Sequence, residues 1–281
     1  MPTVKITCDS ACDLTAALYE QYKIAVLPLG ITLGEELRYD GVNVNAQELF
    51  DYVKASGELP KTSAVSVGAY EDAFRAARED GAQVVHISLS GELSSCYQNA
   101  CIAASAVDGV FVVDSRSLSL GAGHLAIRAR ELADEGLEAV KIAETLEEEK
   151  TNLDVSFVIQ SLDHLHKGGR CPTVAALGAN LLKIRPEIVM TGGKLQLGKK
   201  YRGTMEKSVL DYISGRLAGK SGINCKKLII VHSGVPQELV DKAAALAREL
   251  QPFERVEVYF AGCTISTHAG PNCLGMLVIH E

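Results

Sequence analysis

The sequence contains no tryptophan, no C-x-x-C cysteine pair and no long apolar run. Nucleic-acid surfaces use clustered cations and stacking aromatic rings, and a chain with a net charge of −7 and 5% aromatic residues offers few of either. No stretch reaches the roughly 18 consecutive apolar residues of a membrane-spanning helix, and the first residues alternate like a strand rather than forming a signal peptide. We therefore expect a cytoplasmic protein with no nucleic acid partner and at most transient membrane contact.

Motifs for metals and nucleotides are missing as well. The eight cysteines are spread along the chain without a C-x-x-C pair, so we expect reduced thiols and no structural zinc site. No Walker sequence exists, and six residues separate Asp114, at the end of the predicted strand, from the G-x-G-x-x-A outline of Gly121–Ala126. Because a dinucleotide fingerprint follows its strand directly, the sequence predicts neither a metal nor a nucleotide cofactor.

What the sequence does contain is a regular alternation of strand and helix patterns. With 281 residues, 47% of them apolar, the chain is long enough to bury two modest cores. Strands and helices follow one another in the first part, which is typical of a mainly parallel sheet covered by helices on both faces. The predicted strands there are residues 4–10, 24–34, 82–90, 109–115 and 154–161, and the predicted helices are residues 13–23, 45–56, 69–80, 94–107, 119–136 and 138–151.

The pattern changes near residue 165. Two β-runs flank Gly192 and Gly193, a dipeptide suited to a two-residue hairpin turn. Further strands are predicted over residues 226–234, 255–262 and 273–281, with a helix over residues 236–251. The sequence thus predicts a three-layer α/β domain over residues 1–165 with a mainly parallel sheet, and a smaller C-terminal α+β domain over residues 166–281 with a mixed or antiparallel sheet.

Hydroxyl side chains stand at two predicted helix starts of the first domain. Ser95 begins an S-x-x-Q capping box, so Ser94 lies at a helix N-terminus, where free N–H groups and the helix dipole favour an anion. Three hydroxyl residues precede another predicted helix: Thr62, Ser63 and Ser66. Parallel strands deliver such loops to one edge of the sheet, which favours a shared anion site, whereas helix capping alone also explains each of them.

His268 lies among small and hydroxyl residues in the stretch AGCTISTHAGPNCLG. Either it is a packed structural histidine, or the glycine-rich loop around it clears space for its ring to meet a ligand. Arg170 follows two glycines in LHKGGR, and its planar guanidinium suits a carboxylate or a phosphate; an exposed loop arginine is the alternative. Lys200 and Arg202 add positive charge near the end of the predicted hairpin.

A hydrolytic triad is the main enzymatic alternative. Ser94 and His268, together with Asp9 or Asp114, supply the right residue types. The sequence has no G-x-S-x-G elbow, which would present the serine on a strained turn. Considered alone, these residues leave an anion site, a hydrolase and simple helix capping open.

Seven blocks of the sequence, taken in order, resemble the DegV family of bacterial fatty-acid-binding proteins, and the resemblance spans essentially the whole chain. The blocks are CDSACDL, TSAVSVGAY, LSSCYQNA, VVDSRSLSLGAG, LHKGGR, HSGVP and ISTHAGPNCLG. The resemblance implies an α/β domain beside a smaller α+β domain, with a fatty acid of about C14 to C20 held between them. It also implies that Thr62, Ser94 and His268 meet the ligand carboxylate, that Ser63 belongs to the same site, and that Arg170 supports it.

The resemblance further implies a non-catalytic role. Such a protein presents the fatty acid to a separate, DAK-like fatty acid kinase subunit, which makes an acyl-phosphate for phospholipid synthesis, so no catalytic residue, metal or cofactor is expected here. The chain departs from the family pattern at Ser95 and Cys96 and at Ala64 and Val65, which bears on loop shape and on ligand choice. A Ser-His esterase or thioesterase and a binder of a small anionic metabolite are the alternatives, and chain-length preference and oligomeric state are left open.

Overall fold

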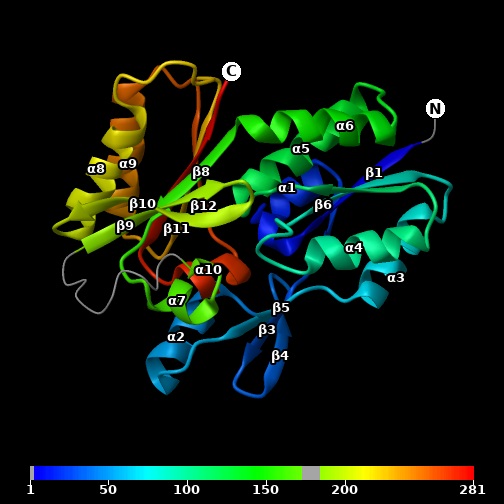
Figure 1. Cartoon of the computed structure of the whole chain (residues 1–281), viewed down its shortest axis with the longest axis horizontal. Coiled ribbons are helices and arrows are strands. Elements are labelled where there is room, and N and C mark those ends of the chain that lie inside the picture. Colours follow the sequence, from blue (N-terminus) through cyan, green and yellow to red (C-terminus); the bar gives the residue numbers. More distant parts are fainter. Residues whose placement is uncertain (1–2, 173–183) are drawn as a thin grey trace. The chain divides into compact units, whose positions relative to one another are not determined.

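The computed structural model describes residues 3–172 and 184–281 (Figure 1). The chain forms two compact units, each described here by itself. The first comprises Met1–Asn45, Pro60–Thr151 and Gly262–Ile265, and the second comprises Ala46–Leu59, Asn152–Ala261 and Ser266–Glu281. A division of the chain into domains 1–165 and 166–281 stays a prediction.

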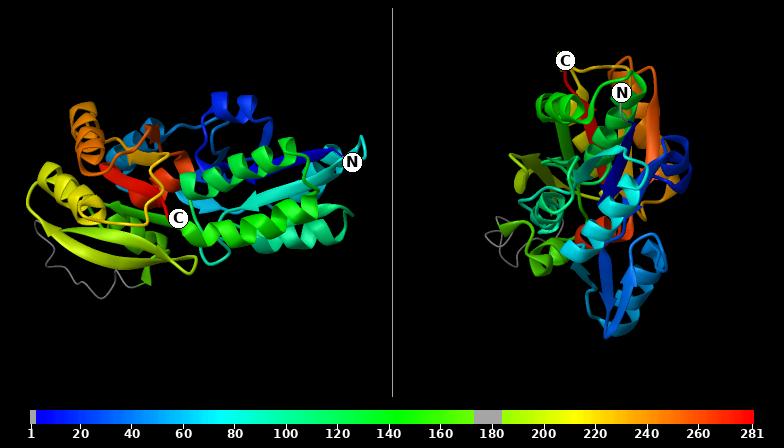
Figure 2. Two further views of the ribbon diagram at one scale, coloured as in Figure 1. Left: turned by 90° about the horizontal axis from the view of Figure 1, so that it is seen from above. Right: turned by 90° about the vertical axis from the view of Figure 1, so that its right-hand side faces the viewer.

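A four-stranded parallel sheet in the order β2-β1-β6-β7 forms the centre of the first unit. The two middle strands are almost wholly buried, as parallel strands covered on both faces should be. Helices α5 and α6 pack on one face of the sheet and α3 and α4 on the other (Figure 1), and α5 and α6 lie side by side (Figure 2). The predicted three-layer arrangement is therefore confirmed. The main elements are β1 (Val4–Asp9), α1 (Ala16–Gln21), β2 (Ile24–Leu27), α3 (Val67–Arg78), β6 (Gln83–Ser88), α4 (Cys96–Ser105), β7 (Val110–Asp114), α5 (Leu120–Asp134) and α6 (Ala139–Glu149).

The first unit also contains a three-stranded antiparallel sheet that the sequence analysis missed. Its order is β4-β3-β5, with β3 at Gly30–Leu33, β4 at Glu36–Tyr39 and β5 at Lys61–Ser63. The prediction of one strand over residues 24–34 is wrong, because β2 and β3 belong to different sheets. Pro28 lies at the break between them, and since proline has no N–H to donate to a ladder, it ends β2.

A six-stranded sheet in the order β10-β9-β8-β13-β11-β12 organises the second unit. β11 and β12 run parallel and the other described pairs run antiparallel, which confirms the predicted mixed sheet. β8 lies between β9 and β13, so the expectation that it continues the parallel sheet is wrong; a buried strand pattern does not specify which sheet it joins. The strands are β8 (Leu153–Val158), β9 (Ile184–Thr191), β10 (Lys194–Arg202), β11 (Leu228–Ser233), β12 (Val256–Phe260) and β13 (Cys273–Ile279).

β9 and β10 form the predicted hairpin around Gly192 and Gly193. The φ angle is 58° at Gly192 and 84° at Gly193, which matches a two-residue turn that needs positive φ at both positions. Helices α8 and α9 pack against each other beside this sheet, and α8 was not predicted. The helices of the second unit include α2 (Ala46–Ser56), α7 (Asp163–Gly168), α8 (Met205–Leu217) and α9 (Gln237–Leu250), while α10 (Cys263–Ala269) has residues in both units.

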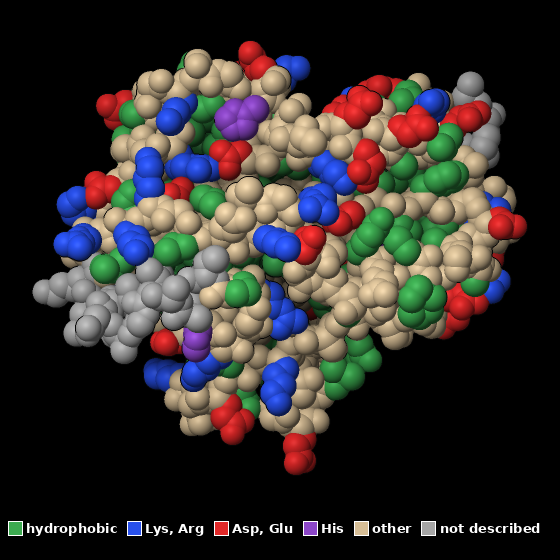
Figure 3. All heavy atoms as spheres, in the orientation of Figure 1, with side chains coloured by type: hydrophobic (Ala, Val, Ile, Leu, Met, Phe, Trp, Pro, Cys, Tyr) green, Lys and Arg blue, Asp and Glu red, His purple; other side chains and the backbone are tan. Residues whose placement is uncertain are grey.

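The surface carries charges of both signs. On the face shown in Figure 3, lysine and arginine side chains are interspersed with aspartate and glutamate side chains, which is typical of a solvated surface. None of the described helices is long and apolar enough to cross a membrane.

Candidate functional site

The carboxyl ends of β1 and β6 meet around Asp9, which is completely buried. Its carboxylate accepts hydrogen bonds from the Tyr70 hydroxyl, from Ser88 Oγ at 2.9 Å and from Leu89 N at 2.7 Å. His86 Nε2 lies 3.4 Å from Asp9 Oδ1. Burial, reinforced by the charge of Asp9, raises the pKa of Tyr70 well above its usual range, so the phenol stays a donor. Asp9 is thus committed to joining elements of the first unit.

Asp114, the other acid considered for a triad, is held by backbone groups. Its Oδ1 accepts from Arg116 N at 2.9 Å and from Gly91 N at 3.2 Å. These bonds shape the loop after β7 and the loop after β6. Both candidate acids therefore already have structural partners, which weakens the hydrolase alternative.

Ser94 lies just before α4, the helix that follows β6. Its Oγ accepts a hydrogen bond from Cys96 N at 3.2 Å, whereas Ser95 makes no side-chain capping bond. The predicted capping box at Ser95 is therefore wrong: Ser95 has helical backbone angles, φ −74° and ψ −1°, instead of the extended angles of a capping residue. The Ser94 hydroxyl also hydrogen-bonds the Cys96 side chain, so in this structure its contacts are with the first residue of α4.

Cys96, the first residue of α4, is fully buried. Burial raises the pKa of its thiol to about 11, and the charge of Asp9 acts in the same direction. A thiol with a raised pKa is neutral at physiological pH and a poor nucleophile.

Thr62 and Ser63 lie on β5, and Ser66 caps α3 by accepting from Ala69 N at 3.2 Å. The side chains of Thr62 and Ser63 point to opposite faces of the small sheet, as successive strand residues do. Ser63 stands opposite Gly30, where a Cβ would lie 2.2 Å from Ser63 Oγ. Glycine at that position leaves the room that the serine side chain occupies.

A contact between side chain and backbone joins the Thr62 segment to the Ser94 helix. Asn99 on α4 donates from Nδ2 to the carbonyl oxygen of Val65 at 2.7 Å. Val65 lies three residues beyond Thr62, and Asn99 lies in the first turn of the helix that Ser94 precedes. The structure thus brings these two hydroxyl segments together, but through α3 and β5 rather than through two strands of the parallel sheet.

In the second unit, His268 lies at the end of α10 rather than in a glycine-rich loop. The space for its ring is left by Gly168 on α7, where a Cβ would lie 2.5 Å from His268 Nδ1. Gly270, with φ 73°, makes room for His164 instead, since a Cβ there would lie 2.7 Å from His164 Cδ2. Each of the two helical segments therefore supplies a glycine that accommodates the other's histidine.

His268 is held in its neutral form by its surroundings. Burial lowers its pKa from 6.5 to about 4, and the positive charges of Arg170 and His164 act in the same direction. Arg170 Nη1 donates to the Gly168 carbonyl oxygen at 2.7 Å, which places the guanidinium beside the same turn. The structure thus brings Arg170 and His268 together, with the charge on the guanidinium and a neutral imidazole next to it.

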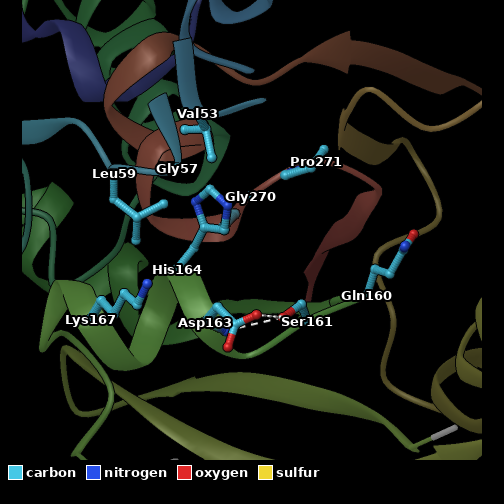
Figure 4. Close-up of a pocket in the computed structure, with 11 residues that line it drawn as sticks. Val53, Gly57, Leu59, Gln160, Ser161, Asp163, His164, Lys167, Gly270 and Pro271 are labelled. Carbon is cyan, nitrogen blue, oxygen red and sulfur yellow. Dashed lines mark hydrogen bonds between the residues drawn. The ribbon is translucent and has the colours of Figure 1, made fainter. Parts of the chain in front are cut away.

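A cavity of about 220 Å³ opens at α7 and the end of α10 (Figure 4). His164 lines it, and Nδ1 of His164 lies 2.9 Å from the Thr267 carbonyl oxygen; because a carbonyl can only accept, this nitrogen carries the proton. Sequence reasoning missed this cavity, although the histidines and lysine of SLDHLHKGGR, directly before two glycines, were a visible signal. The lining residues are Val53, Gly57, Leu59, Gln160, Ser161, Asp163, His164, Lys167, Ala269, Gly270 and Pro271.

The part of the chain that the structure describes contains no cluster of side chains arranged to bind a metal ion. Over residues 3–172 and 184–281, no group of three or more His, Cys, Asp or Glu side chains could hold a metal ion. None of the eight cysteines, which all lie within the described residues, forms a disulfide. The ligand-binding chemistry on offer is therefore hydroxyl donors in the first unit, and a neutral histidine, an arginine and the cavity in the second.

Comparisons with known proteins match the whole chain. A family model described as "Uncharacterised protein, DegV family" matches residues 3–281. A DegV domain-containing protein of Staphylococcus aureus (strain COL) is 30% identical over 278 residues, which cover 98% of each chain. A solved structure described as fatty acid binding of a DegV family protein from Thermus thermophilus is 28% identical with a TM-score of 0.88, and covers 99% of this chain and 100% of that one. A Thermotoga maritima protein, whose structure is described as revealing fatty acid binding function, is 25% identical with a TM-score of 0.84 and full coverage of both chains.

Proposed function

The chain belongs to the DegV family, and we propose that it binds one long-chain fatty acid and holds the carboxylate for a partner enzyme without catalysing a reaction itself. The observation that carries this proposal is the full-length likeness to the fatty-acid-binding protein of Thermus thermophilus. A lipid carrier also accords with a sequence that has no phosphate-binding loop and with candidate triad acids that already have structural partners.

We assign the carboxylate contacts to Thr62, Ser94 and His268, with Arg170 as a supporting cation; Ser63 belongs to the same β5 segment as Thr62 but points to the other face of the small sheet. Hydroxyl groups donate to a carboxylate without carrying charge, and Ser94 supplies one such group just before α4. Neutral His268 adds a further hydrogen bond, and Arg170 supplies the compensating positive charge. Such a set binds a carboxylate in preference to a neutral ester or alcohol.

Most of the affinity is expected from the acyl chain. Burying about 14 methylenes of a palmitoyl chain contributes on the order of 11 kcal/mol before the entropy of immobilising the chain is subtracted. Each polar contact to the carboxylate contributes about 1 kcal/mol. The polar residues therefore orient the head group, and the apolar surface holds the ligand.

In the second step that we propose, a separate fatty acid kinase phosphorylates the exposed carboxylate. A carboxylate oxygen attacks the terminal phosphorus of a nucleoside triphosphate held by the kinase, an O–P bond forms, and the bridging P–O bond breaks to release the nucleoside diphosphate. Arg202 ends β10 and is exposed, so it and Arg170 are our candidates for contacting the kinase or the new phosphate. Unchanged kinase turnover with both Arg170→Ala and Arg202→Ala proteins would remove that role.

The first experiment is to denature protein purified from a bacterial host, extract it with organic solvent and identify the extract by mass spectrometry. We expect close to one fatty acid of about C14 to C20 per chain, since burial of that many methylenes favours retention through purification. Folded protein that is free of lipid and does not take up added palmitate or oleate would refute fatty acid binding.

A variant series tests the head-group residues. Ser94→Ala should weaken palmitate binding by about fivefold to tenfold, the loss of one hydrogen bond to a charged group. Ser105→Ala is the matched control, because Ser105 is an exposed serine on the same helix that bonds only its own helix backbone. Turnover of a chromogenic acyl ester by the wild type that disappears in Ser94→Ala would favour the esterase alternative instead.

A further inference from the structure

We propose that the cavity between α7, the end of α10 and the α2 segment is a subsite for a phosphoryl dianion. This inference rests on the proposed function, in which the phosphoryl group is the one added to the fatty acid carboxylate. The cavity borders the residues that flank His268: Ala269 and Gly270 line it, and so does Lys167, next to the Gly168 that contacts the His268 ring. A group attached to a carboxylate at His268 would thus have this cavity beside it.

Lys167 supplies the cation of the subsite. It is exposed and extends from α7 into the cavity lining (Figure 4), and no ion pair engages it within the described residues. Asp163 stands four residues earlier on the same helix, a spacing that often pairs with lysine. Its carboxylate instead accepts from Ser161 Oγ at 2.6 Å, and Ser161 Oγ accepts from Asp163 N at 3.2 Å. The ammonium of Lys167 therefore remains for a ligand.

The remaining polar groups of the lining are of both kinds: Asp163 is acidic and its carboxylate is bonded to Ser161 Oγ, while one amide can donate. Gln160 lines the cavity with an amide that can donate. His164 is buried and its Nδ1 proton is used by the Thr267 carbonyl, so the ring is a fixed part of the cavity wall rather than a donor of that proton to a ligand. Val53, Leu59 and Pro271 form the apolar part of the wall.

Size and charge distinguish a phosphoryl group from other occupants. The volume of about 220 Å³ lies below the roughly 300 to 1,000 Å³ of pockets that enclose drug-sized ligands. A phosphoryl group brings about −1.5 to −2 charges and three acceptor oxygens near neutral pH, whereas a fatty acid carboxylate brings one charge and two oxygens. A separate cation outside the carboxylate site is needed only after phosphorylation.

Binding of two palmitoyl ligands by isothermal titration calorimetry tests the proposal. One ligand is palmitate, and the other is the palmitoyl methylphosphonate analogue in which a methylene replaces the bridging oxygen of palmitoyl phosphate. Lys167→Ala should weaken the phosphonate by about tenfold, one charge-assisted contact, and palmitate by less than about twofold. Lys167→Arg should restore phosphonate binding. Lys54→Ala is the matched control, because Lys54 is exposed on α2 but does not line the cavity.

A titration with inorganic phosphate tests the phosphoryl subsite independently of fatty acid binding. In NMR titrations of wild-type protein we expect phosphate to shift the His164 ring signals, and the shift to vanish in Lys167→Ala. If palmitate fails to bind while phosphate still shifts these signals through Lys167, the fatty acid proposal falls and the anion subsite stands. Equal loss of palmitate and phosphonate in Lys167→Ala, or no Lys167-dependent effect with either phosphonate or phosphate, overturns the subsite.

Discussion

The low pKa of His268 makes a prediction about how acid affects the protein. The imidazole titrates near 6.5 in an unfolded chain, and burial together with the charges of Arg170 and His164 lowers its pKa to about 4 in the folded protein. Between these two values the unfolded chain holds a proton that the folded chain does not hold. Lowering the pH from 6.5 toward 4 therefore favours unfolding. Above about 6.5 the imidazole is neutral in both states, and the folded protein has its full free energy of unfolding.

The size of the effect follows from the two pKa values. At pH 4.5 the unfolded His268 is almost fully protonated and the folded His268 mostly neutral, so acidification from pH 7 costs on the order of 2 kcal/mol of unfolding free energy at this one residue. His268→Gln removes the titration while keeping a polar side chain. The variant should therefore lose about 2 kcal/mol less than the wild type over the same pH interval, whatever its stability at pH 7.

Two measurements on protein stripped of lipid check this reasoning. Urea denaturation at pH 7, 5.5 and 4.5 gives the free energies of unfolding for both proteins. NMR titration of the histidine ring protons gives the pKa directly, and the signal missing from the His268→Gln spectrum identifies His268 among the seven histidines. A midpoint near 6.5, or parallel loss of stability in the two proteins, would refute the account. Added palmitate should raise the midpoint, because a nearby carboxylate favours the imidazolium.

Two further predictions concern close packing at α7 and hydrogen bonding at the start of α10. Gly168→Ala should destabilise the protein and displace the NMR signals of His268, because the new Cβ would lie 2.5 Å from the ring, although alanine favours a helix by about 1 kcal/mol. Gly68→Ala on α3 is its control, since no atom lies within 4 Å of a Cβ there, and it should stabilise the protein slightly in thermal melts. Asp40→Ala should lower the free energy of unfolding by about 3 kcal/mol, because the buried Asp40 carboxylate accepts from Thr264 Oγ1 at 2.6 Å and from Thr264 N at 3.1 Å. Asp40→Asn should cost less than Asp40→Ala in urea denaturation, and equal losses in the two variants would contradict the hydrogen-bond explanation.

The accuracy of the sequence-based predictions depends on how local each feature is. The hairpin at Gly192 and Gly193 was predictable because a two-residue turn needs positive φ that glycine adopts without strain. Ser66 was predictable as a helix cap because this contact is also local: its partner, Ala69 N, lies three residues away. Pro28 was also a local signal, and had it been weighed, residues 24–34 would have been divided into two strands.

Contacts between distant residues set the candidate site, and no local pattern predicts them. The bond from Asn99 to the Val65 carbonyl joins two segments 34 residues apart. Gly168 accommodates the ring of His268, which lies on a different helix. The chemistry of these residues was visible in the sequence, but their neighbours were not.

The sequence by itself determined most of the alternation of strands and helices, the hairpin, the Ser66 helix cap and the residue types that suit an anionic head group, because each depends on side-chain periodicity or on backbone angles within a few residues. Only the tertiary structure decided that β8 joins the mixed sheet, that His268 is neutral, and that His164 and Lys167 share a cavity. Sheet membership, desolvation and cavity shape each depend on contacts between residues far apart in the chain, and those contacts form only when the chain packs.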